Sequence, residues 1–522
     1  MATINWTVAN IVRRGAASHP AHTALRYQDG AFSYGDLNAR SNRVARGLLA
    51  LGIQRGARIA VLDKNSPEQL DILFGVSKAL AVCVPVNWRL ALQEIALVLN
   101  DARATVLFAG AEYLAAIEQI RDELIWLKHI FVFEPAGKFI SYTAWMLKQS
   151  AEELETEVLP DEVALQLYTS GTTGVPKGVM LTNRNLFTLL DQGGRLWGLD
   201  TNTRSIVCMP LFHIGGIGWA LACMRHGGTA VLVRTFGAAD VLRLIEDERA
   251  THINLVPAMI RLMVDSPSAS KHDYSSLCLV LYGTAPISRP LLLAALEAFD
   301  CSFVQVYGLT ETTSAITQLD AADHQVCGPR EALLRSAGRP YPWVEAKIVD
   351  PSTLEPCPVG KTGELWVRSA QNMKGYWMNE EATATTFDEF GWLRTGDCGH
   401  LDHEGYLFLT DRVKDMIVSG GENVYPAEAE NLLVEHPLVA EAAVIGVPHP
   451  TWGETAKAII VLKPGGHIPE QELIDWLHKR LAHYKCPTSV EFVRELPVNA
   501  AGKVLKRVLR EPYWKGHTRR IS

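Results

Sequence analysis

Residues 168–178 read Tyr-Thr-Ser-Gly-Thr-Thr-Gly-Val-Pro-Lys-Gly, a short segment of glycines and hydroxyls with one lysine. Small residues let backbone N–H groups turn toward an anion, and hydroxyl side chains add donors. Lys177 supplies a positive charge for phosphate oxygens. The order differs from a Walker A loop, because Pro176 precedes the lysine and Gly178 follows it. The segment therefore predicts a phosphate-binding loop of another type, with a solvated Gly/Ser/Thr turn as the alternative.

Other segments with chemistry-bearing or small residues follow along the chain. They are Pro-Leu-Phe-His (210–213), Tyr-Gly-Thr-Ala-Pro (282–286), Tyr-Gly-Leu-Thr-Glu-Thr (307–312), Trp-Leu-Arg-Thr-Gly-Asp (392–397), the run from Asp411 to Pro426, and Pro-Val-Asn-Ala-Ala-Gly-Lys (497–503). The segments at 282 and 307 each follow a strand-like run. Ligands of open α/β sheets bind at the carboxyl ends of strands, so both segments are candidates for a ligand site.

Taken together and in this order, the segments resemble the adenylate-forming superfamily, in its acyl-CoA synthetase branch. The resemblance covers nearly the whole chain. It implies a two-step reaction in which a carboxylate and ATP give acyl-AMP and pyrophosphate, and CoA then displaces AMP. ATP, Mg²⁺ and coenzyme A are the cofactors that it implies.

The resemblance also assigns roles to individual residues. Glu311 would hold Mg²⁺, for which a carboxylate is a suitable hard ligand. Lys503 would bridge the carboxylate and the α-phosphate in the transition state, where negative charge is most concentrated. The implied catalytic residues are Lys177, His213, Thr310, Glu311 and Lys503. Those implied to bind ATP or AMP are Thr169, Ser170, Gly171, Thr172, Thr173, Gly174, Lys177, Gly283, Thr284, Ala285, Tyr307, Gly308, Thr310, Asp397, Arg412 and Lys503.

For the second step, the resemblance places Gly420 and Gly421 beside the pantetheine thiol, where glycine lets backbone pass close to a thin ligand. Trp452 and Tyr484 match positions that contact CoA in relatives. Cys486 departs from the pattern, since some relatives carry a basic residue there, near the CoA phosphates. Lys414 falls at the position where the small domain of this family pivots.

Simpler interpretations accompany several of these residues. Thr310 or Thr312 could be the N-cap of a helix, and residues 283–286 could form a plain strand-to-helix turn. His213 could be a satisfied core histidine, and an isolated Asp397 or Arg412 would usually be a solvated surface charge. The basic residues that follow Lys503 are expected to be solvated; they are Lys506, Arg507 and Arg510.

The hydrophobic pattern predicts the elements that position these residues. Between residues 58 and 109, apolar runs at 58–62, 82–86 and 105–109 alternate with helical patterns at 66–80 and 92–100, which is typical of a parallel sheet. Similar strand-like runs recur at 205–208, 229–233, 252–256, 278–282 and 303–306. The segments 344–349, 363–367 and 406–409 alternate with period two and predict a small antiparallel sheet or barrel.

The predicted fold class is α/β, with two related α/β halves and a small β-barrel-like subdomain in a large N-terminal domain, residues 1–410. A mobile α+β domain, residues 411–522, follows a hinge near 411–415. Its predicted helices are 427–435 and 469–481, and its predicted strands are 441–447 and 456–462. A length of 522 residues suits about three or four folding units in all.

Composition excludes several classes of protein. The net charge is −7, so no basic surface for nucleic acid is indicated. The nine cysteines are scattered without metal-ligand spacing, which predicts reduced thiols in a cytoplasmic protein. No apolar run approaches the length of a membrane span. Peripheral membrane contact and a homodimer stay open.

The acid and the exact branch of the family also stay open. The segments expected to line the acyl pocket carry no charged residue except Glu311, which predicts a medium- or long-chain fatty acid, with an aryl acid as the alternative. An amino-acid adenylation domain would place an Asp after Phe236, where this chain has Gly237. An adenylation-only or luciferase-like enzyme and a silent binding protein are further alternatives, and the intact Lys177, Glu311 and Lys503 disfavour the last.

Overall fold

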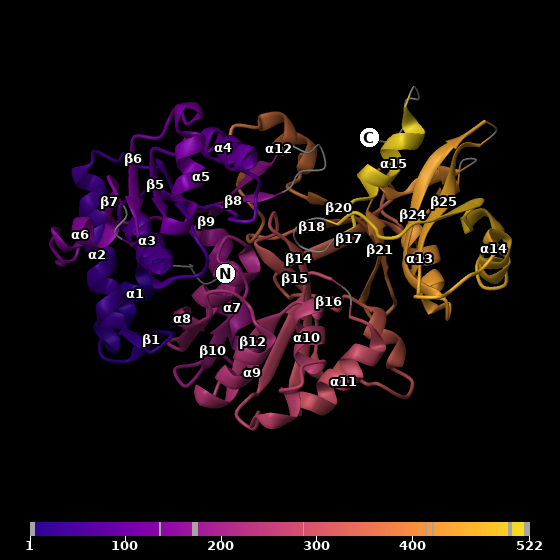
Figure 1. Ribbon diagram of the computed structural model, residues 1–522, viewed down its shortest axis with the longest axis horizontal. Helices are drawn as coiled ribbons and strands as arrows, with labels where there is room; N and C mark the ends of the chain where they lie inside the picture. The colour runs from indigo at the N-terminus through magenta and orange to yellow at the C-terminus, as the bar shows by residue number, and fades with distance from the viewer. Residues whose placement is uncertain are drawn as a thin grey trace. The chain divides into compact units, whose positions relative to one another are not determined.

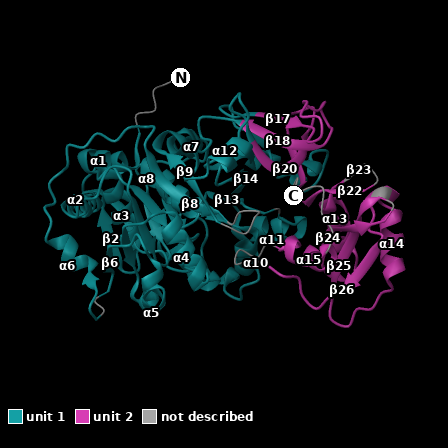
Figure 2. Ribbon diagram, turned by 90° about the horizontal axis from the view of Figure 1, so that it is seen from above, with its two compact units in different colours: residues 1–345, 368–393 teal, residues 346–367, 394–522 magenta. Residues whose placement is uncertain are grey.

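The computed structural model describes residues 6–134, 137–169, 176–285, 287–412, 415–419, 422–450, 452–498 and 504–515. The chain divides into two compact units, residues 1–345 with 368–393 and residues 346–367 with 394–522 (Figure 2). The fold is α/β, as the sequence predicts. The domain boundary expected at 411–415 stays a prediction.

The first unit contains a large, mostly parallel sheet with the order β16-β15-β14-β13-β12-β10-β11-β1-β2. Its strands are β1 (Thr23–Tyr27), β2 (Gly30–Ser33), β10 (Arg204–Val207), β11 (Thr229–Leu232), β12 (His252–Leu255), β13 (Leu279–Gly283), β14 (Ser302–Leu309), β15 (Ser314–Leu319) and β16 (Arg339–Pro340). The strand-like runs predicted between 205 and 306 are confirmed, and β14 continues beyond its prediction to Leu309.

Helices cover both faces of this sheet (Figure 1). Helices α9 (Ala238–Asp247), α10 (Pro257–Val264) and α11 (Arg289–Phe299) pack against Val280 and Tyr282 on one face. Leu281 points to the opposite face, since successive strand side chains alternate. There it meets α7 (Asn183–Leu196) and α8 (Ile214–Arg225) around a cavity.

A second sheet of the first unit has the order β19-β9-β8-β4-β3-β5-β6-β7. Its strands are β3 (Arg58–Leu62), β4 (Val82–Pro85), β5 (Val106–Ala109), β6 (His129–Val132), β7 (Ile140–Ser141), β8 (Val163–Thr169), β9 (Lys177–Thr182) and β19 (Gly375–Tyr376). Its helices are α1 (Val8–Ser18), α2 (Tyr34–Ala50), α3 (Pro67–Lys78), α4 (Leu92–Asp101), α5 (Leu114–Gln119), α6 (Tyr142–Leu147) and α12 (Glu380–Thr386). The strands and helices predicted between 58 and 109 are all present.

Asn65 ties the two sheets together. Its side-chain amide donates to the carbonyl oxygens of Met209 and Val233, both at 3.0 Å, and its oxygen accepts from Leu211 N at 2.9 Å. The residue is 3% exposed, so these bonds are shielded from water. This single side chain therefore fixes the segment that leads into His213.

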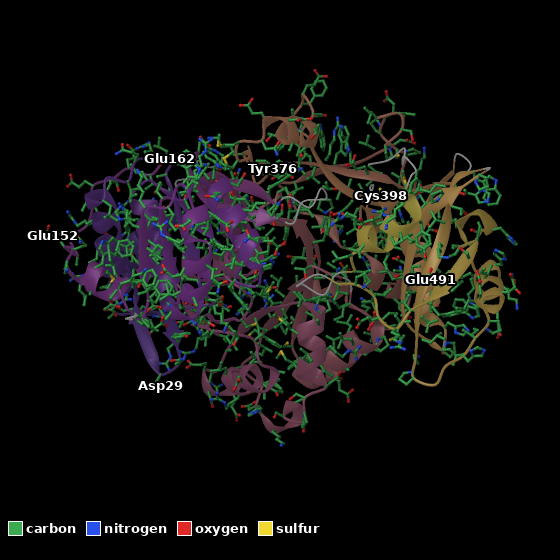
Figure 3. All side chains as sticks on the ribbon, turned by 45° about the horizontal axis from the view of Figure 1, so that its top comes forward. Asp29, Glu152, Glu162, Tyr376, Cys398 and Glu491 are labelled. Atoms are coloured by element: carbon green, nitrogen blue, oxygen red, sulfur yellow. The ribbon has the colours of Figure 1, made fainter. Side chains whose placement is uncertain are left out.

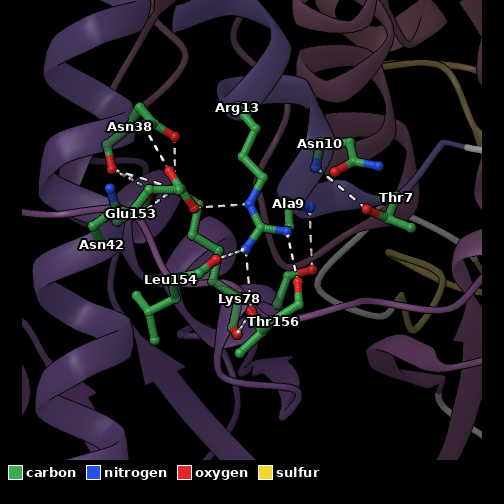
Figure 4. A network of polar contacts seen from close by, with 12 residues as sticks. Thr7, Ala9, Asn10, Arg13, Asn38, Asn42, Lys78, Glu153, Leu154 and Thr156 are labelled. Carbon is green, nitrogen blue, oxygen red and sulfur yellow. Dashed lines mark hydrogen bonds and ion pairs between the residues drawn. The ribbon is translucent and has the colours of Figure 1, made fainter. Parts of the chain in front are cut away.

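A buried lysine joins the N-terminal helices (Figure 4). Lys78 is fully buried, and its Nζ donates to Asn38 Oδ1 at 2.6 Å and to Asn42 Oδ1 at 2.5 Å. Glu153 Oε2 forms an ion pair with Lys78 Nζ at 3.4 Å, and Glu153 Oε1 accepts a hydrogen bond from Arg13 Nε at 2.8 Å. Helices α1, α2 and α3 are thus connected through one polar network with residues 153–156.

The second unit has two small sheets. One has the order β17-β18-β20-β21, from β17 (Glu345–Val349), β18 (Gly363–Arg368), β20 (Leu393–Leu401) and β21 (Leu407–Arg412). The other has the order β23-β22-β25-β24, from β22 (Ile417–Ser419), β23 (Glu422–Val424), β24 (Val439–His449) and β25 (Gly453–Leu462), with β26 (Ser489–Phe492) beside β25. Helices α13 (Pro426–Glu435), α14 (Glu470–His478) and α15 (Lys506–Trp514) complete the unit, which confirms the elements predicted after residue 426.

None of the helices in the described part of the chain is both long and apolar enough to cross a membrane. All nine cysteines are free, and Cys83, Cys208, Cys223, Cys398 and Cys486 are buried.

Candidate active site

The glycine-rich segment is the loop of a β-hairpin. Strand β8 ends at Thr169 and β9 begins at Lys177, and these two residues face each other in an antiparallel register. The sequence analysis predicted no strand between this loop and the helix that begins at Asn183, so strand β9 was missed. Ser170, Gly171, Thr172, Thr173 and Gly174 lie outside the described residues. The hairpin nevertheless fixes both ends of the predicted phosphate loop.

Lys177 and Glu311 both contact one tyrosine, Tyr376. The Lys177 Nζ sits over the ring of Tyr376, 5.0 Å from its centre, and the Tyr376 hydroxyl donates to Glu311 Oε1 at 3.0 Å (Figure 3 labels Tyr376). Burial and then the Glu311 charge raise the pKa of Tyr376, so the hydroxyl keeps its proton and remains a donor. The structure thus brings the lysine of one motif and the carboxylate of another into one cluster.

Tyr376 is a site residue that the sequence reasoning missed. It belongs to the two-residue strand β19, which pairs with β9 opposite Val179. A strand this short carries no periodic pattern, and the residue stands 65 positions from Glu311. The segment Gly375-Tyr376 therefore gave no signal in the sequence.

Residues 310–313 form the turn between β14 and β15, so the expectation of a helix N-cap at Thr310 or Thr312 is wrong. The Thr312 hydroxyl lies inside the turn, where it accepts from Leu309 N at 2.8 Å and donates to Ser314 O at 2.9 Å. A hydroxyl satisfies the backbone of a tight hairpin as well as that of a helix start, which explains the ambiguity of the sequence. Tyr307 and Gly308 come directly before Leu309, the last residue of strand β14.

Gly283 and Thr284 lie at the carboxyl end of β13, beside β14. Gly283 faces Val306 in the parallel register, and a Cβ atom on it would stand 2.4 Å from the Val306 carbonyl oxygen. Thr284 has φ +69°, a left-handed conformation that is uncommon for a β-branched residue. Thr284 and Ala285 are exposed. The segment also leads into helix α11, so the strand-to-helix turn and the ligand-binding interpretation coexist.

His213 caps helix α8 and presents a neutral imidazole. Its Nδ1 accepts from Gly215 N at 3.0 Å, which leaves the proton of the neutral ring on Nε2. Burial lowers the pKa of His213 below its usual range, so the ring is neutral at pH 7. The residue is partly exposed and makes no other hydrogen bond to the described residues, so Nε2–H is available to a ligand.

An apolar cavity opens beside His213. It has a volume of about 30 Å³ and lies between α7, α8 and strands β12 to β15. Most of its lining is hydrophobic. Gly215 also lies close to Met209, since a Cβ on Gly215 would stand 2.9 Å from Met209 Cε. Its lining comprises Leu186, Leu189, Leu190, Trp197, Ile214, Gly215, Gly218, Trp219, Asn254, Leu281, Val306, Thr313, Ser314 and Ala315.

Mg²⁺ fits the donors of this site. Glu311 is partly exposed, and its Oε1 has Tyr376 as a partner. Among the described residues, no group of three or more His, Cys, Asp or Glu could hold a metal ion. Mg²⁺ is commonly bound by one or two carboxylates together with substrate phosphates and water, so a single Glu311 is an adequate protein ligand.

In the second unit, Asp397 and Arg412 face each other on neighbouring strands. They are Cα partners in the antiparallel β20–β21 pair, and Asp397 is 7% exposed. Asp397 N donates to Thr395 Oγ1, and the preceding Gly396 N donates to Glu364 Oε1 at 3.0 Å. The register brings this predicted ribose-binding pair together on the same two strands.

Two of the residues predicted near CoA, Ser419 and Trp452, are described in the second unit. Ser419 pairs with Glu422 across the β22–β23 hairpin and with Gly453 on β25. Gly420 and Gly421, and the side chain of Tyr484, lie outside the described residues. Trp452 is 47% exposed and stacks on His449 with ring centres 4.4 Å apart. The exposed ring of Trp452 therefore lies one residue before β25, the strand that pairs with β22.

Cys486 belongs to the core of the second unit. It is 3% exposed and packs with the apolar residues of α13, α14 and β25. Burial raises the pKa of its thiol to about 11. A position in this core presents nothing to phosphate groups, so Cys486 does not replace the basic residue of some relatives.

Lys503 and Lys414 lie outside the described residues. The chain that brackets Lys503 is described: Val498 and Val504 form an antiparallel bridge, and Leu505 N donates to Pro497 O at 2.8 Å.

The expectation that Lys506 and Arg510 are solvated is wrong. Lys506 Nζ contacts Glu430 Oε1 at 2.8 Å, and Arg510 contacts Asp415 at 3.1 Å, with the basic side chains 15% and 13% exposed. One face of α15 is therefore anchored by ion pairs, whereas Arg507 on another face is exposed.

Comparison with known proteins supports the same interpretation. The family model described as AMP-binding enzyme matches residues 12–377, and that described as AMP-binding enzyme C-terminal domain matches residues 428–503. The chain is 38% identical over 521 residues to the fatty acid–[acyl-carrier-protein] ligase ScoC of Streptomyces coeruleorubidus, covering 97% of this chain and 96% of the relative. It is 39% identical over 504 residues to a feruloyl-CoA synthase of an Amycolatopsis species, covering 96% and 98%.

A solved structure agrees over the whole chain. The crystal structure of ATP-bound MatB from Rhodopseudomonas palustris matches with a TM-score of 0.86 and 30% identity, covering 98% of this chain and 100% of that one. Together with the two family matches, this likeness extends across both units. The chain therefore belongs to the AMP-binding enzyme family, within the adenylate-forming superfamily that its motifs predict.

Proposed function

We propose that this AMP-forming acid–CoA ligase activates an apolar carboxylic acid. The observation that carries the proposal is the cluster of Lys177, Tyr376 and Glu311, because it joins a phosphate-loop lysine to a magnesium-type carboxylate. The apolar cavity beside His213 supplies a place for the body of the acid.

In the first step, a carboxylate oxygen attacks the α-phosphorus of ATP and pyrophosphate leaves with its bonding electron pair. Both reactants are anions, so the site must neutralise charge as they approach. Lys177 is proposed to contact the phosphate oxygens, Glu311 would hold Mg²⁺, and Nε2–H of His213 would donate to an oxygen of the acid or the phosphate. Lys503 is proposed to add a cation between the two reactants.

In the second step, the thiolate of CoA attacks the acyl carbon, and AMP leaves. Asp397 and Arg412 are proposed to hold the ribose during both steps. Gly420 and Gly421 are proposed to admit the pantetheine arm, and Trp452 offers an exposed ring beside it. Lys414 is the proposed pivot that exchanges the two arrangements.

The cavity supports a hydrophobic acid. Its described lining contains no Asp, Glu, Lys or Arg, so a second charge on the substrate would be desolvated there without a partner. Each methylene buried contributes about 0.8 kcal/mol. Fatty acids and aryl acids both meet this requirement, and the names of the relatives include both kinds. A cytoplasmic location stays a prediction of the sequence.

An ATP–pyrophosphate exchange assay tests the proposal. We expect exchange that depends on Mg²⁺ and on acids of an alkyl and aryl panel, and CoA-dependent release of AMP with the same acids. Lys177→Met should lower exchange at least tenfold, whereas Lys374→Met, at an exposed position nearby, should retain it. Absence of exchange with every acid, or equal effects of the two substitutions, would contradict the assignment.

A second candidate acceptor is a pantetheine thiol carried by a protein. The observation that favours it is the buried Cys486, which leaves the nucleotide end of CoA without the basic partner of some relatives. Acceptor comparison separates the two: a CoA ligase should show a kcat/KM for CoA well above that for a phosphopantetheinyl carrier protein. Higher kcat/KM with the carrier protein would identify it as the acceptor.

A further inference from the structure

Two cysteines stand at the start of neighbouring strands in the large sheet of the first unit. Cys278 comes directly before β13, and Cys301 comes directly before β14. These strands pair in parallel, with Leu279 opposite Ser302. Ser302 N also donates to Cys278 O at 3.1 Å, so the backbone hydrogen bonds of the pair extend to this end. One residue before the first Cα partners, Cys278 therefore stands opposite Cys301.

Both cysteine side chains belong to the same face of the sheet. Val280 and Phe303 lie in the hydrophobic core on this face, and Cys301 packs against that core. Side chains two residues apart on a strand point the same way. Cys278 precedes Val280 by two residues, as Cys301 precedes Phe303, so the two thiols are side by side.

The spacing of the two backbones suits a disulfide. Neighbouring strands lie about 4.8 Å apart. The Cα atoms of a disulfide usually lie about 4.4–6.8 Å apart. Both cysteines are free thiols in this structure. The sheet therefore already holds Cys278 and Cys301 at the separation that an S–S bond between them requires.

The two thiols differ in their access to solvent. Cys278 is exposed, and its Sγ donates to Ser276 O at 3.5 Å. Cys301 is partly buried; burial, and then the neighbouring Cys278, raise the pKa of its thiol to about 12. A dissolved oxidant therefore meets Cys278 first. The thiolate is the reactive form, so a following reaction of Cys301 becomes faster as pH rises.

We propose that Cys278 and Cys301 are a redox pair that closes into a reversible disulfide when the protein meets a small-molecule disulfide such as glutathione disulfide. The Cys278 thiolate attacks one sulfur of the oxidant, the S–S bond of the oxidant breaks, and one thiolate leaves with the electron pair. The Cys301 thiolate then attacks the Cys278 sulfur of this mixed disulfide and releases the second thiolate. The two cysteines lose two protons and two electrons, and one oxidant molecule becomes two thiols.

The disulfide joins the two strands away from the proposed nucleotide-binding residues. Gly283 follows Cys278 by five residues along β13, or about 16 Å at about 3.3 Å per residue. The bond also closes residues 278–301 into a ring, which restricts the unfolded chain. We therefore expect the oxidised protein to keep pyrophosphate exchange within about twofold of the reduced protein and to show a Tm roughly 3–5 °C higher.

Peptide mapping after oxidation tests the proposal. The protein is incubated with glutathione disulfide at about pH 8, where thiolates form more readily, and the remaining free thiols are alkylated. Chymotrypsin then cleaves after aromatic residues such as Tyr282 and Phe299, which places the two cysteines on separate peptides. Mass spectrometry should find these two peptides joined, and dithiothreitol should separate them and return Tm to that of the reduced protein.

Three substitutions identify the role of each thiol. Cys301→Ser should retain a mixed disulfide with glutathione on Cys278, because the second thiol is missing. Cys278→Ser should give no joined peptide. Cys327→Ser is the matched control at another exposed cysteine, and it should give the same joined peptide and the same rise in Tm as the wild type.

Two results would overturn the inference. Peptides that stay separate after prolonged oxidation of the wild type, each carrying glutathione or the alkyl group, would show that the two cysteines do not pair. A joined peptide with an unchanged Tm, or a rise in Tm that persists in Cys301→Ser, would remove the stabilising role of the bond. Neither result depends on which acid the enzyme activates, so the proposed function is tested separately.

Discussion

Replacing Lys506 with methionine should destabilise the second unit and weaken adenylation through it. Lys506 Nζ lies 2.8 Å from Glu430 Oε1 and 3.6 Å from Asp411 Oδ2. The three side chains are 15%, 17% and 7% exposed. Methionine preserves most of the length of the side chain and removes its charge. The two carboxylates then remain buried without their cation.

The expected loss follows from this burial. Removing one partner of a buried ion pair usually costs about 3–5 kcal/mol. We expect about 3 kcal/mol in the free energy of unfolding, at the lower end, because each group keeps some exposure and Val444 N still donates to Glu430 Oε1. For a unit of about 150 residues, this loss lowers Tm by roughly 6–12 °C.

The pKa of Glu430 decides how the loss of stability in Lys506→Met changes with pH. Burial raises the pKa of Glu430, against the opposing charge of Lys506. Without Lys506 this pKa should rise further, so protonation relieves the buried charge as pH falls. The deficit of Lys506→Met relative to wild type should therefore shrink between pH 7 and pH 5.

Thermal and urea unfolding measure the effect, with Arg507→Met as the control. Arg507 is the next residue, carries the same charge and is exposed, so its replacement should change stability by about 0.5 kcal/mol or less. Pyrophosphate exchange should also fall in Lys506→Met, since α15 begins two residues after the Val498–Val504 bridge that brackets Lys503. Equal Tm shifts for the two variants would refute the reasoning.

Further predictions concern the other charged groups. Lys503→Ala should cut acyl-AMP formation by several orders of magnitude, while purified acyl-AMP and CoA react at nearly the wild-type rate. Lys414→Pro should leave pyrophosphate release measurable and abolish thioester formation, because proline fixes φ near about −65°. Tyr376→Phe should lower kcat/KM for Mg·ATP about tenfold, since it removes the hydrogen bond to the Glu311 carboxylate. Burial raises the pKa of Glu153, but the hydrogen bond from Arg13 and the charge of Lys78 outweigh burial and lower this pKa to about 2. Glu153 therefore contributes about 1 kcal/mol of stability above pH 4.5, and this contribution is lost as the pH falls toward 2. Glu153→Gln should flatten this dependence of stability on pH.

The first three of these predictions each have a distinct contrary result, and the fourth has a matched control. Equal loss of both half-reactions in Lys503→Ala would remove its assignment to adenylation, and normal thioester turnover in Lys414→Pro would move the pivot elsewhere. Unchanged Mg·ATP kinetics in Tyr376→Phe would show that its hydroxyl does not position Glu311. For the acid titration, Glu152→Gln is the matched control, because Glu152 is 83% exposed and should leave the pH dependence unchanged.

Regular elements were predictable where burial imposes a period. Strand β3 and helix α4 match their predicted ranges closely, because continuous apolar runs and one-sided helical patterns reflect how each element faces the core. Strand β9 was missed since its start at Lys177 belongs to the glycine-rich motif. The two-residue strand β19 is too short for any period to appear.

The candidate site was predictable from motifs only in part. Motifs identified Lys177 and Glu311 separately, but not that a third residue, Tyr376, contacts both. Residue type alone left Thr312 ambiguous, because one hydroxyl suits both a helix cap and a hairpin turn. The burial of Lys506 was equally hidden, since its acidic partners are distant in sequence and basic residues near a chain end are usually solvated.

The geometry of the cluster also explains why residues 371–377 matter to the chemistry. Gln371 Nε2 donates to Thr312 O at 2.9 Å, and Met373 N donates to Glu311 O at 2.8 Å, so this segment holds the β14–β15 turn. A few residues on, Tyr376 pairs with β9, the strand that starts at Lys177. One short segment thus connects both hairpins, and each contact is made by backbone or by a buried side chain. Because the lysine and the carboxylate are tied to the same segment, their separation is set before ATP binds, and little reorganisation is needed to receive its phosphates and Mg²⁺.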